Sequence, residues 1–229
     1  MINTIFEDLG LINYKKAWDH QIQLFEALLL NKSSEISNKE QYIIFCEHPH
    51  VFTNGKSGNH SNLLINKELL EQKEIEYYDI DRGGDITYHG PGQQVVYPIL
   101  DLDEFGINTR EYVYRLEEAV IKTLESFSIK AARLHGAAGI WIDVEDKSKC
   151  RKICAIGVKS SRRVTMHGLA LNINADLKYF SYMNPCGFID KGVTSMQQEL
   201  GQMVDTNLVK SKLKENFIVQ FNIDSLVSH

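Results

Sequence analysis

The stretch Val164-Thr165-Met166-His167-Gly168-Leu169-Ala170-Leu171-Asn172-Ile173-Asn174 decides the fold class of this chain. Every second residue from Leu169 to Ile173 is large and apolar, a period of two that is typical of a β-strand. Two further strands are expected just before it, at residues 139–144 and 152–158, joined by a charged turn. Strands that follow one another closely pair as hairpins, whereas parallel strands need a long crossover. The sequence therefore predicts an α+β fold with a mixed, largely antiparallel sheet flanked by helices.

Three more strands and four helices are expected outside this stretch. The strands are residues 42–46, 77–80 and 95–100. Asn13 is expected to cap a helix that reaches from Tyr14 to about Leu30, and Asn108 to cap a second one, with Glu111 completing a capping box. Thr194 with Gln197 predicts a short helix, and a C-terminal helix is expected from the apolar residues Leu208, Leu213 and Phe217.

Length, charge and hydropathy exclude several classes of protein. The 229 residues fit a single domain, 1–229. The net charge of −5 argues against nucleic acid as the main partner, since no basic excess is present to neutralise phosphates. No apolar run reaches the roughly 18 residues of a membrane span, and no signal peptide is recognisable, so we expect a cytoplasmic protein with no membrane partner. A strand followed by G-x-G-x-x-G and a helix is absent, which argues against a dinucleotide-binding fold.

A glycine-rich run carries the first functional signal. It reads Arg82-Gly83-Gly84-Asp85-Ile86-Thr87-Tyr88-His89-Gly90-Pro91-Gly92-Gln93 and is expected as a loop between two strands. Glycines let the backbone approach a ligand closely, while the Arg, Thr, Tyr and His side chains supply specific contacts.

Cys186 carries the second signal, because it lies in the turn-forming sequence Asn184-Pro185-Cys186-Gly187. A turn exposes the thiol, although a buried structural cysteine is the simpler interpretation of most cysteines. A free thiol has a pKa of about 8.5, so a nucleophilic cysteine needs a neighbouring cation or base. Together with the glycine-rich run, this cysteine suggests an enzyme that holds an acyl group as a thioester.

Two lysines and two histidines could activate that thiol. Lys152 begins an otherwise apolar strand, and Lys159 at its other end is an equal candidate by spacing alone. His89 in the glycine-rich run and His167 in a strand offer a Cys–His pair instead, although a histidine within a strand is more often structural.

The other cysteines indicate neither a metal site nor a disulfide. Cys150 and Cys154 are spaced C-x₃-C, but no second Cys/His pair lies nearby in the sequence. Cys46 falls within an apolar strand and is expected to be buried. We therefore predict no bound metal.

Residues 147–163 form a basic stretch without a single acidic residue. Such a run is usually a solvated surface. In a protein of net negative charge it could also bind an acidic partner next to the reactive thiol.

At these motifs the chain resembles the lipoyl(octanoyl) transferase family. The resemblance covers about residues 6–200, with a C-terminal helical extension after it. It rests on Phe6-Glu7-Asp8-Leu9-Gly10 with Tyr14, Glu47-His48-Pro49, Val51-Phe52-Thr53, Gly55, residues 82–93, 152–157 and 167–172, Pro185-Cys186-Gly187 and Val193-Thr194-Ser195. It implies a fold related to biotin-protein and lipoate-protein ligases.

The resemblance also implies the site residues. Cys186 would carry the acyl group and Lys152 would activate it. The acyl pocket would be lined by Arg82, Gly83, Gly84, Asp85, Ile86, Thr87, Tyr88, His89, Ala155, Ile156, Gly157, Gly168, Leu169 and Ala170. Backbone N–H groups near Gly83, Gly84 or Gly187 could stabilise the oxyanion. Cys154 stands where another small residue is expected and would place a second thiol near Lys152.

The activity implied is transfer of an octanoyl group from acyl carrier protein to a lysine of lipoyl domains or of the glycine-cleavage H protein. The enzyme would be a monomer and would need no cofactor, because phosphopantetheine arrives on the carrier. Two alternatives are an ATP-dependent lipoate or octanoate ligase of the same fold, and a non-catalytic module that binds acyl carrier protein.

Overall fold

The computed structural model describes residues 3–34, 40–184, 192–223 and 225–228. Its main sheet has the strand order β12-β1-β2-β6-β10-β9-β8-β7, and β11 pairs with β9 outside this order. The strands are β1 (Asn3–Leu11), β2 (Glu40–Glu47), β6 (Gln93–Ile99), β7 (Ala132–Leu134), β8 (Ala137–Ile142), β9 (Arg151–Ser161), β10 (Val164–Asn172), β11 (Gly192–Val193) and β12 (Ser225–Ser228).

The pairing confirms the predicted fold class. From β2 through β6, β10, β9 and β8 to β7 every neighbouring pair is antiparallel, while β1 is parallel to both β2 and β12. A second sheet of three short strands has the order β4-β3-β5 and comprises β3 (Val51–Asn54), β4 (Glu76–Asp79) and β5 (Thr87–His89).

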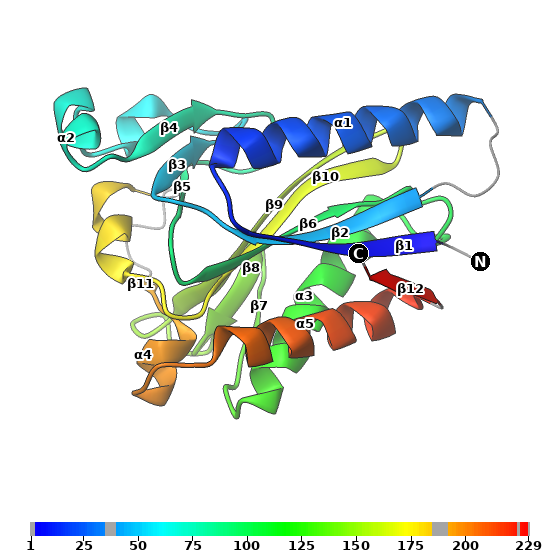
Figure 1. Ribbon diagram of the computed structural model, residues 1–229. Helices are drawn as coiled ribbons and strands as arrows, with labels where there is room; N and C mark the ends of the chain where they lie inside the picture. Colours follow the sequence, from blue (N-terminus) through cyan, green and yellow to red (C-terminus); the bar gives the residue numbers. More distant parts are fainter. Residues whose placement is uncertain (1–2, 35–39, 185–191, 224, 229) are drawn as a thin grey trace.

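Helices cover both faces of the main sheet (Figure 1). On one face lies α1 (Tyr14–Ser33), whose Ala17, Phe25 and Leu28 are buried against β6 and β10. On the other face α3 (Thr109–Ser126) and α5 (Thr206–Phe221) pack against the sheet and against each other. The shorter helices are α2 (Lys67–Gln72), α4 (Met196–Leu200) and two 3₁₀ segments, η1 (His60–Asn62) and η2 (Leu177–Tyr182). Among the described residues no helix is both long and apolar enough to span a bilayer.

Two predicted helix caps are confirmed, and the short helix expected from Thr194 and Gln197 is present as α4. The Asn13 side chain accepts from the backbone N–H groups of Lys15 and Lys16, and Asn108 accepts from that of Glu111. The short helix is capped by Ser195, not by Thr194. Thr194-x-x-Gln197 and Ser195-x-x-Gln198 match the capping pattern equally well, and the Thr194 hydroxyl bonds Glu199 instead.

The glycine-rich run is also more ordered than predicted. It was expected as a loop, but Thr87–His89 within it forms β5, which pairs antiparallel with β3. This pairing joins residues more than thirty positions apart, so no local pattern could reveal it.

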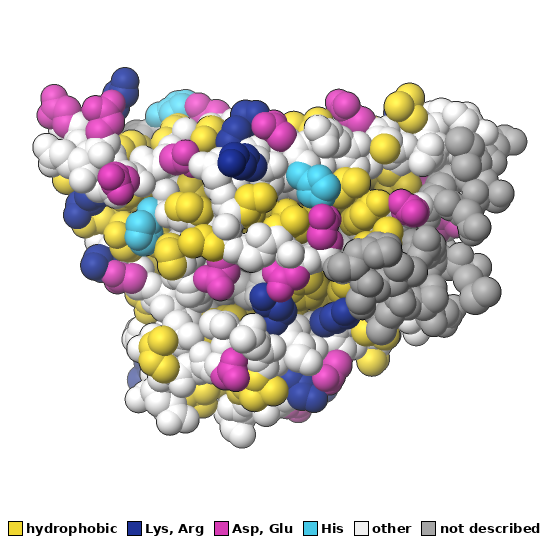
Figure 2. All heavy atoms as spheres, viewed as in Figure 1, with side chains coloured by type: hydrophobic (Ala, Val, Ile, Leu, Met, Phe, Trp, Pro, Cys, Tyr) yellow, Lys and Arg dark blue, Asp and Glu magenta, His cyan; other side chains and the backbone are white. Residues whose placement is uncertain are grey.

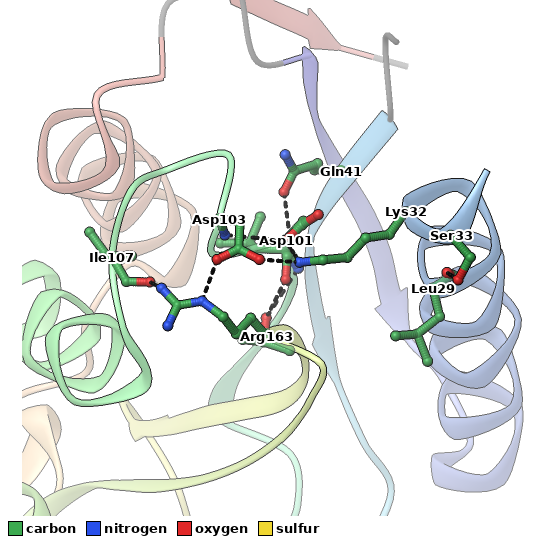
Figure 3. Close-up of polar contacts among 10 residues, drawn as sticks. Leu29, Lys32, Ser33, Gln41, Asp101, Asp103, Ile107 and Arg163 are labelled. Atoms are coloured by element: carbon green, nitrogen blue, oxygen red, sulfur yellow. Dashed lines mark hydrogen bonds and ion pairs between the residues drawn. The ribbon is translucent and has the colours of Figure 1, made fainter. Parts of the chain in front are cut away.

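A network of charges fastens the end of α1 to the main sheet (Figure 3). Lys32 bonds both Asp101 and Asp103, and Arg163 bonds Asp103 and the carbonyl of Ile107. The network ties α1 to the connection after β6 and to the turn between β9 and β10. It therefore lies at the opposite end of β9 from Lys152.

Candidate functional site

A cavity of about 410 Å³ is bordered by β6, β9 and β10 of the main sheet and by β5 of the small sheet. Tyr14, Val95 and Tyr97 contribute to its wall, and Phe180 and Met183 reach it from the end of η2. The tip of the β7–β8 hairpin, residues 136–138, completes the lining on another side. This volume lies within the range of small-molecule sites in proteins.

The structure brings most of the expected pocket residues to this cavity. From the glycine-rich run Arg82, Gly84, Asp85, Ile86, Thr87 and His89 line it, and so do residues 155–157 and 168–170.

Gly83 and Tyr88 were expected in the pocket but are not among the lining residues. The N–H of Gly83 donates to the carbonyl of Val158. The Tyr88 side chain lies on the opposite side of β5 from its neighbours, since side chains alternate along a strand. There it stacks on Tyr179, and its hydroxyl lies 2.7 Å from Nδ1 of His50.

Gly168, one of the expected pocket residues, is required by the packing of the sheet. A Cβ added there would lie 2.0 Å from the carbonyl oxygen of Val96. The missing side chain therefore allows β6 and β10 to approach each other. The same reasoning applies at Gly157, where a Cβ would lie 2.9 Å from the carbonyl oxygen of Gly83 and 3.0 Å from Cδ of Arg82.

Arg82 fastens the glycine-rich run to the small sheet. Its guanidinium donates to the carbonyl and hydroxyl oxygens of Thr53 on β3, at 2.7 and 3.0 Å, and to the carbonyl of Gly83. The side chain is 7% exposed. These bonds give Arg82 a structural task besides its place in the cavity wall.

A β-bulge in β9 turns Lys152 toward the cavity. Ile140 of β8 pairs with Cys154, but the next residue, Trp141, pairs with Lys152, so Ile153 is the extra residue. Ile153 and Cys154 are both buried in the core beneath α3 and α5. The bulge thus changes the alternation of the strand and places Lys152 on the cavity side, which is a known use of bulges near active sites.

Trp141 faces Lys152 within the cavity wall. The ammonium nitrogen lies 4.6 Å from the centroid of the indole ring, within the range of a cation–π contact. The sequence reasoning missed Trp141, because only the pairing of β8 with β9 brings the two residues together.

Lys159, the rival lysine, does not line the cavity. Its ammonium pairs with the carboxylate of Asp81 at 2.5 Å and lies 4.8 Å from the ring centroid of Phe25. Of the two lysines, the structure therefore brings only Lys152 to the cavity.

His167 lies in the cavity wall with an unusual backbone conformation, φ +60° within β10. Its N–H leaves the sheet and donates to Oε1 of Gln21 on α1. Its Nε2 donates to Asp81 at 3.0 Å, and burial lowers the pKa of the imidazole, which is therefore neutral at pH 7. The hydrogen bond from His167 and the ammonium of Lys159 together hold the pKa of Asp81 well below its usual range, despite its partial burial.

Two backbone carbonyls fix the tautomer of His89. The carbonyl of Thr194 can only accept, so Asn172 presents Nδ2 to it at 2.9 Å and Oδ1 to Nε2 of Gln93 at 2.8 Å. Nε2 of Gln93 also donates to the carbonyl of Tyr88. The remaining oxygen of Gln93 must accept, so the proton of His89 lies on Nδ1, 3.3 Å away, and Nε2 is left as an acceptor. Burial lowers the pKa of His89 well below its ordinary value and keeps the ring neutral.

Cys186 lies outside the described residues, as does Gly187. The described residues on both sides of this gap border the cavity. Met183 lines it before the gap, and Gly192 and Val193 line it afterwards, paired with Arg151 and Lys152 on β9.

The three described cysteines, Cys46, Cys150 and Cys154, are buried. Burial raises the pKa of the Cys46 and Cys154 thiols, which opposes thiolate formation at either position. Within the part of the chain that the structure describes, no cluster of three His, Cys, Asp or Glu side chains could hold a metal ion.

The basic stretch does not form one continuous charged surface. Most of its charges are paired with carboxylates, as in Lys149–Asp146, Arg151–Asp143, Arg151–Glu199, Lys159–Asp81 and Arg163–Asp103. The stretch also runs the whole length of β9, so its two ends are far apart. Basic and acidic side chains are likewise intermixed on the face shown in Figure 2.

Comparison with known proteins agrees with this fold. Residues 13–218 match the lipoyl protein ligase A/B catalytic domain family. The octanoyltransferase of Bacteroides fragilis (strain YCH46) is 57% identical over 212 residues, which are 93% of this chain and 95% of the relative.

Two solved structures show that the fold is shared more widely. A bipartite lipoate protein ligase from Thermoplasma acidophilum aligns with a TM-score of 0.70 at 14% identity, over 100% of this chain and 88% of that chain. A biotin protein ligase from Aquifex aeolicus aligns with a TM-score of 0.50 at 13% identity, over 97% of this chain and 71% of that chain. The sequence identity over nearly the full length of both chains, and the family match across residues 13–218, show that this chain belongs to the octanoyltransferases of the lipoyl protein ligase A/B catalytic domain family.

Proposed function

We propose that this protein transfers an octanoyl group from octanoyl-acyl carrier protein to a lysine of lipoyl domains or of the glycine-cleavage H protein, through a thioester on Cys186. The observation that carries the proposal is the position of Lys152. Its side chain lines a cavity that is also bordered by the described residues on both sides of Cys186. The family membership and the octanoyltransferase names of the relatives support the acyl group and the reaction.

In the first half-reaction the Cys186 thiolate attacks the thioester carbonyl of the octanoyl carrier. A carbon–sulfur bond to Cys186 forms, and the bond to the phosphopantetheine sulfur breaks. Lys152 stabilises the Cys186 thiolate as an ammonium and then gives its proton to the departing sulfur. The products are octanoyl-Cys186, the carrier thiol and a neutral lysine.

In the second half-reaction the acceptor lysine, as a free amine, attacks octanoyl-Cys186. A carbon–nitrogen bond forms and the carbon–sulfur bond breaks, while Lys152 takes the proton that the amine loses. The ion pair of Cys186 and Lys152 is thereby restored. An amide is more stable than a thioester, so neither ATP nor a protein-bound cofactor is required.

The developing oxyanion needs a backbone N–H donor in the cavity. The N–H of Gly83 already donates to Val158. We therefore assign this role to Gly84, which lines the cavity, or to Gly187, which lies outside the described residues. The protein would act as a monomer in the cytoplasm, where both protein substrates meet.

Octanoyl transfer from carrier to an apo lipoyl domain, measured with and without ATP, tests the proposal. Transfer that is independent of ATP and absent in Cys186→Ser is expected. Transfer that requires free octanoate and ATP would show an ATP-dependent ligase instead. Carrier binding without any transfer would show a non-catalytic binding module.

A further inference from the structure

Thr194 is the point where three elements around the cavity meet. Its N–H donates to the carbonyl of Lys152 on β9 at 2.9 Å, and its carbonyl accepts from Nδ2 of Asn172 on β10 at 2.9 Å. Its hydroxyl donates to Oε1 of Glu199 on α4 at 2.5 Å. The residue is fully buried, so these three bonds are shielded from water.

Glu199 is in turn fixed by the residue next to Lys152. The guanidinium of Arg151 binds its carboxylate at two points, Nε to Oε1 at 2.7 Å and Nη2 to Oε2 at 2.6 Å. Burial alone would raise the pKa of Glu199, but the bonds from Arg151 and Thr194 outweigh it and lower that pKa, so the carboxylate is charged at pH 7. Two-point Arg–carboxylate pairs hold both partners in a defined geometry.

These contacts lie where the pairing of β9 with its neighbours on both sides is irregular or short. The bulge interrupts the regular pairing of β9 with β8 at this position. On the other side β11 has only two residues, Gly192 and Val193, and so short a strand is not stable by itself. A shift of β11 by one residue would exchange the faces of its side chains. The backbone bonds from Gly192 to Cys150 and from Thr194 to Lys152 set this register, and the hydroxyl of Thr194 and the Arg151–Glu199 pair add side-chain bonds that favour it.

We infer that Thr194 is a positioning residue for the transfer reaction. Through Glu199 and Arg151 it holds β11 in register with Lys152 and so places the lysine relative to the chain that follows Cys186. The inference rests on the proposed function only for the identity of the substrate. The geometric claim concerns Lys152 and the thiol that it activates.

Three variants test this role. Thr194→Val keeps the shape of the side chain but removes the hydroxyl, whereas Thr194→Ser keeps the hydroxyl. Thr165→Val is the matched control, because Thr165 is also fully buried and its hydroxyl also donates a hydrogen bond, in this case to the carbonyl of Pro98, away from the cavity. For each variant we would measure kcat and KM for the octanoyl carrier, the melting temperature, and the pH dependence of Cys186 alkylation by iodoacetamide.

Thr194→Val should lower kcat by about 10- to 100-fold, the usual effect of misplacing a reacting group by about 1 Å, while KM for the carrier changes little. The alkylation profile should shift to higher pH, since the thiolate loses its positioned cation. Thr194→Ser should stay within about threefold of wild type in kcat. Thr165→Val should lower the melting temperature and leave both kcat and the alkylation profile unchanged.

The inference is wrong if Thr194→Val keeps the wild-type kcat and alkylation profile, or if Thr194→Ser is impaired as severely as Thr194→Val. If Thr194→Val does not fold, Glu199→Gln takes its place, because it removes the charge that holds Arg151 and should shift the same two readouts. Failure of the proposed function gives a different result. A wild-type protein that transfers no octanoyl group would contradict that function. The comparison of its alkylation profile with that of Thr194→Val would still decide the role of Thr194.

Discussion

Lys152 and Trp141 face each other across the β8–β9 pair, with the ammonium nitrogen 4.6 Å from the indole centroid. The contact exists because one extra residue in β9, Ile153, reverses the alternation of the strand just after Lys152. Without the bulge, the side chain of residue 152 would share the face of Cys154 and point into the core. The position of Lys152 in the cavity wall is therefore a product of strand register.

The first prediction separates Lys152 from its rival Lys159. Lys152→Ala should slow octanoylation of Cys186 by about 10²- to 10⁴-fold, the usual contribution of a positioned acid–base group. Lys152→Arg keeps a charge but cannot release a proton at neutral pH, so it should keep part of the thiol reactivity and lose amide formation. Lys159→Ala, whose partner is Asp81, should leave both half-reactions near wild type. Single-turnover rates of each half-reaction would check this prediction. Equal losses of rate in Lys152→Ala and Lys159→Ala would contradict it.

The second prediction concerns packing at Gly168. Gly168→Ala should lower the free energy of unfolding by about 1–3 kcal/mol or more, because the new methyl group would overlap the carbonyl of Val96. Gly83→Ala is the control, since its Cβ would lie 3.3 Å from the carbonyl oxygen of Val158 and needs only a slight adjustment. Urea unfolding measures both. If Gly168→Ala lost no more free energy of unfolding than Gly83→Ala, the close approach of β6 and β10 would not require glycine.

The third prediction is a loss of stability in acid caused by His48. Its Nδ1 donates to the carbonyl of Ile12 and its Nε2 accepts from the hydroxyl of Tyr97, so the folded protein holds it neutral. Burial lowers its pKa to about 4, whereas the unfolded chain binds a proton near pH 6.5. The folded pKa is the lower one, so this stabilisation is complete above about pH 6.5 and is lost as the pH falls toward 4.

The loss attributable to His48 should be roughly 3 kcal/mol across that interval. His48→Gln should flatten the dependence of unfolding free energy on pH. His60→Gln should not, because the side chain of His60 is 73% exposed. A His48→Gln slope that equals that of wild type would show that another group controls acid unfolding.

The fourth prediction locates the carrier-binding surface within the basic stretch. Lys147 and Lys149 are exposed in the turn that leads to Lys152, whereas Arg162 lies in the turn at the other end of β9. If the stretch binds an acidic carrier at the cavity, Lys147→Glu with Lys149→Glu should raise KM for the carrier and weaken its salt dependence, with kcat little changed. Arg162→Glu should change neither. A larger KM effect from Arg162→Glu would place carrier binding at the far end of β9.

Local signals predicted much of the fold. The caps at Asn13 and Asn108 depend on residues within three positions, and the alternation in β10 depends on its own sequence, so both could be found without a structure. The pairing of β5 with β3 and the contact of Trp141 with Lys152 depend on residues that meet only through the sheet. The sequence did not single out Ser195 as the cap of α4, because two overlapping patterns fitted equally well.

For the site, too, local motifs could be found in the sequence, whereas contacts made through the sheet could not. Most of the residues that the family motifs assign to the acyl pocket line one cavity, since each motif contributes a contiguous segment. They could not separate side chains that face the cavity from those that face away, which is why Tyr88 was expected in the wall. Spacing also left Lys152 and Lys159 equivalent until the bulge and the Asp81 pair distinguished them.

An intact mass spectrum of the protein after incubation with octanoyl-acyl carrier protein tests the central claim most directly. The account predicts a single octanoyl adduct on the wild-type protein, released by hydroxylamine, mapped to Cys186 by peptide analysis and absent in Cys186→Ser. An adduct that forms at the wild-type rate in Cys186→Ser, or that maps to one of the buried cysteines, would contradict it.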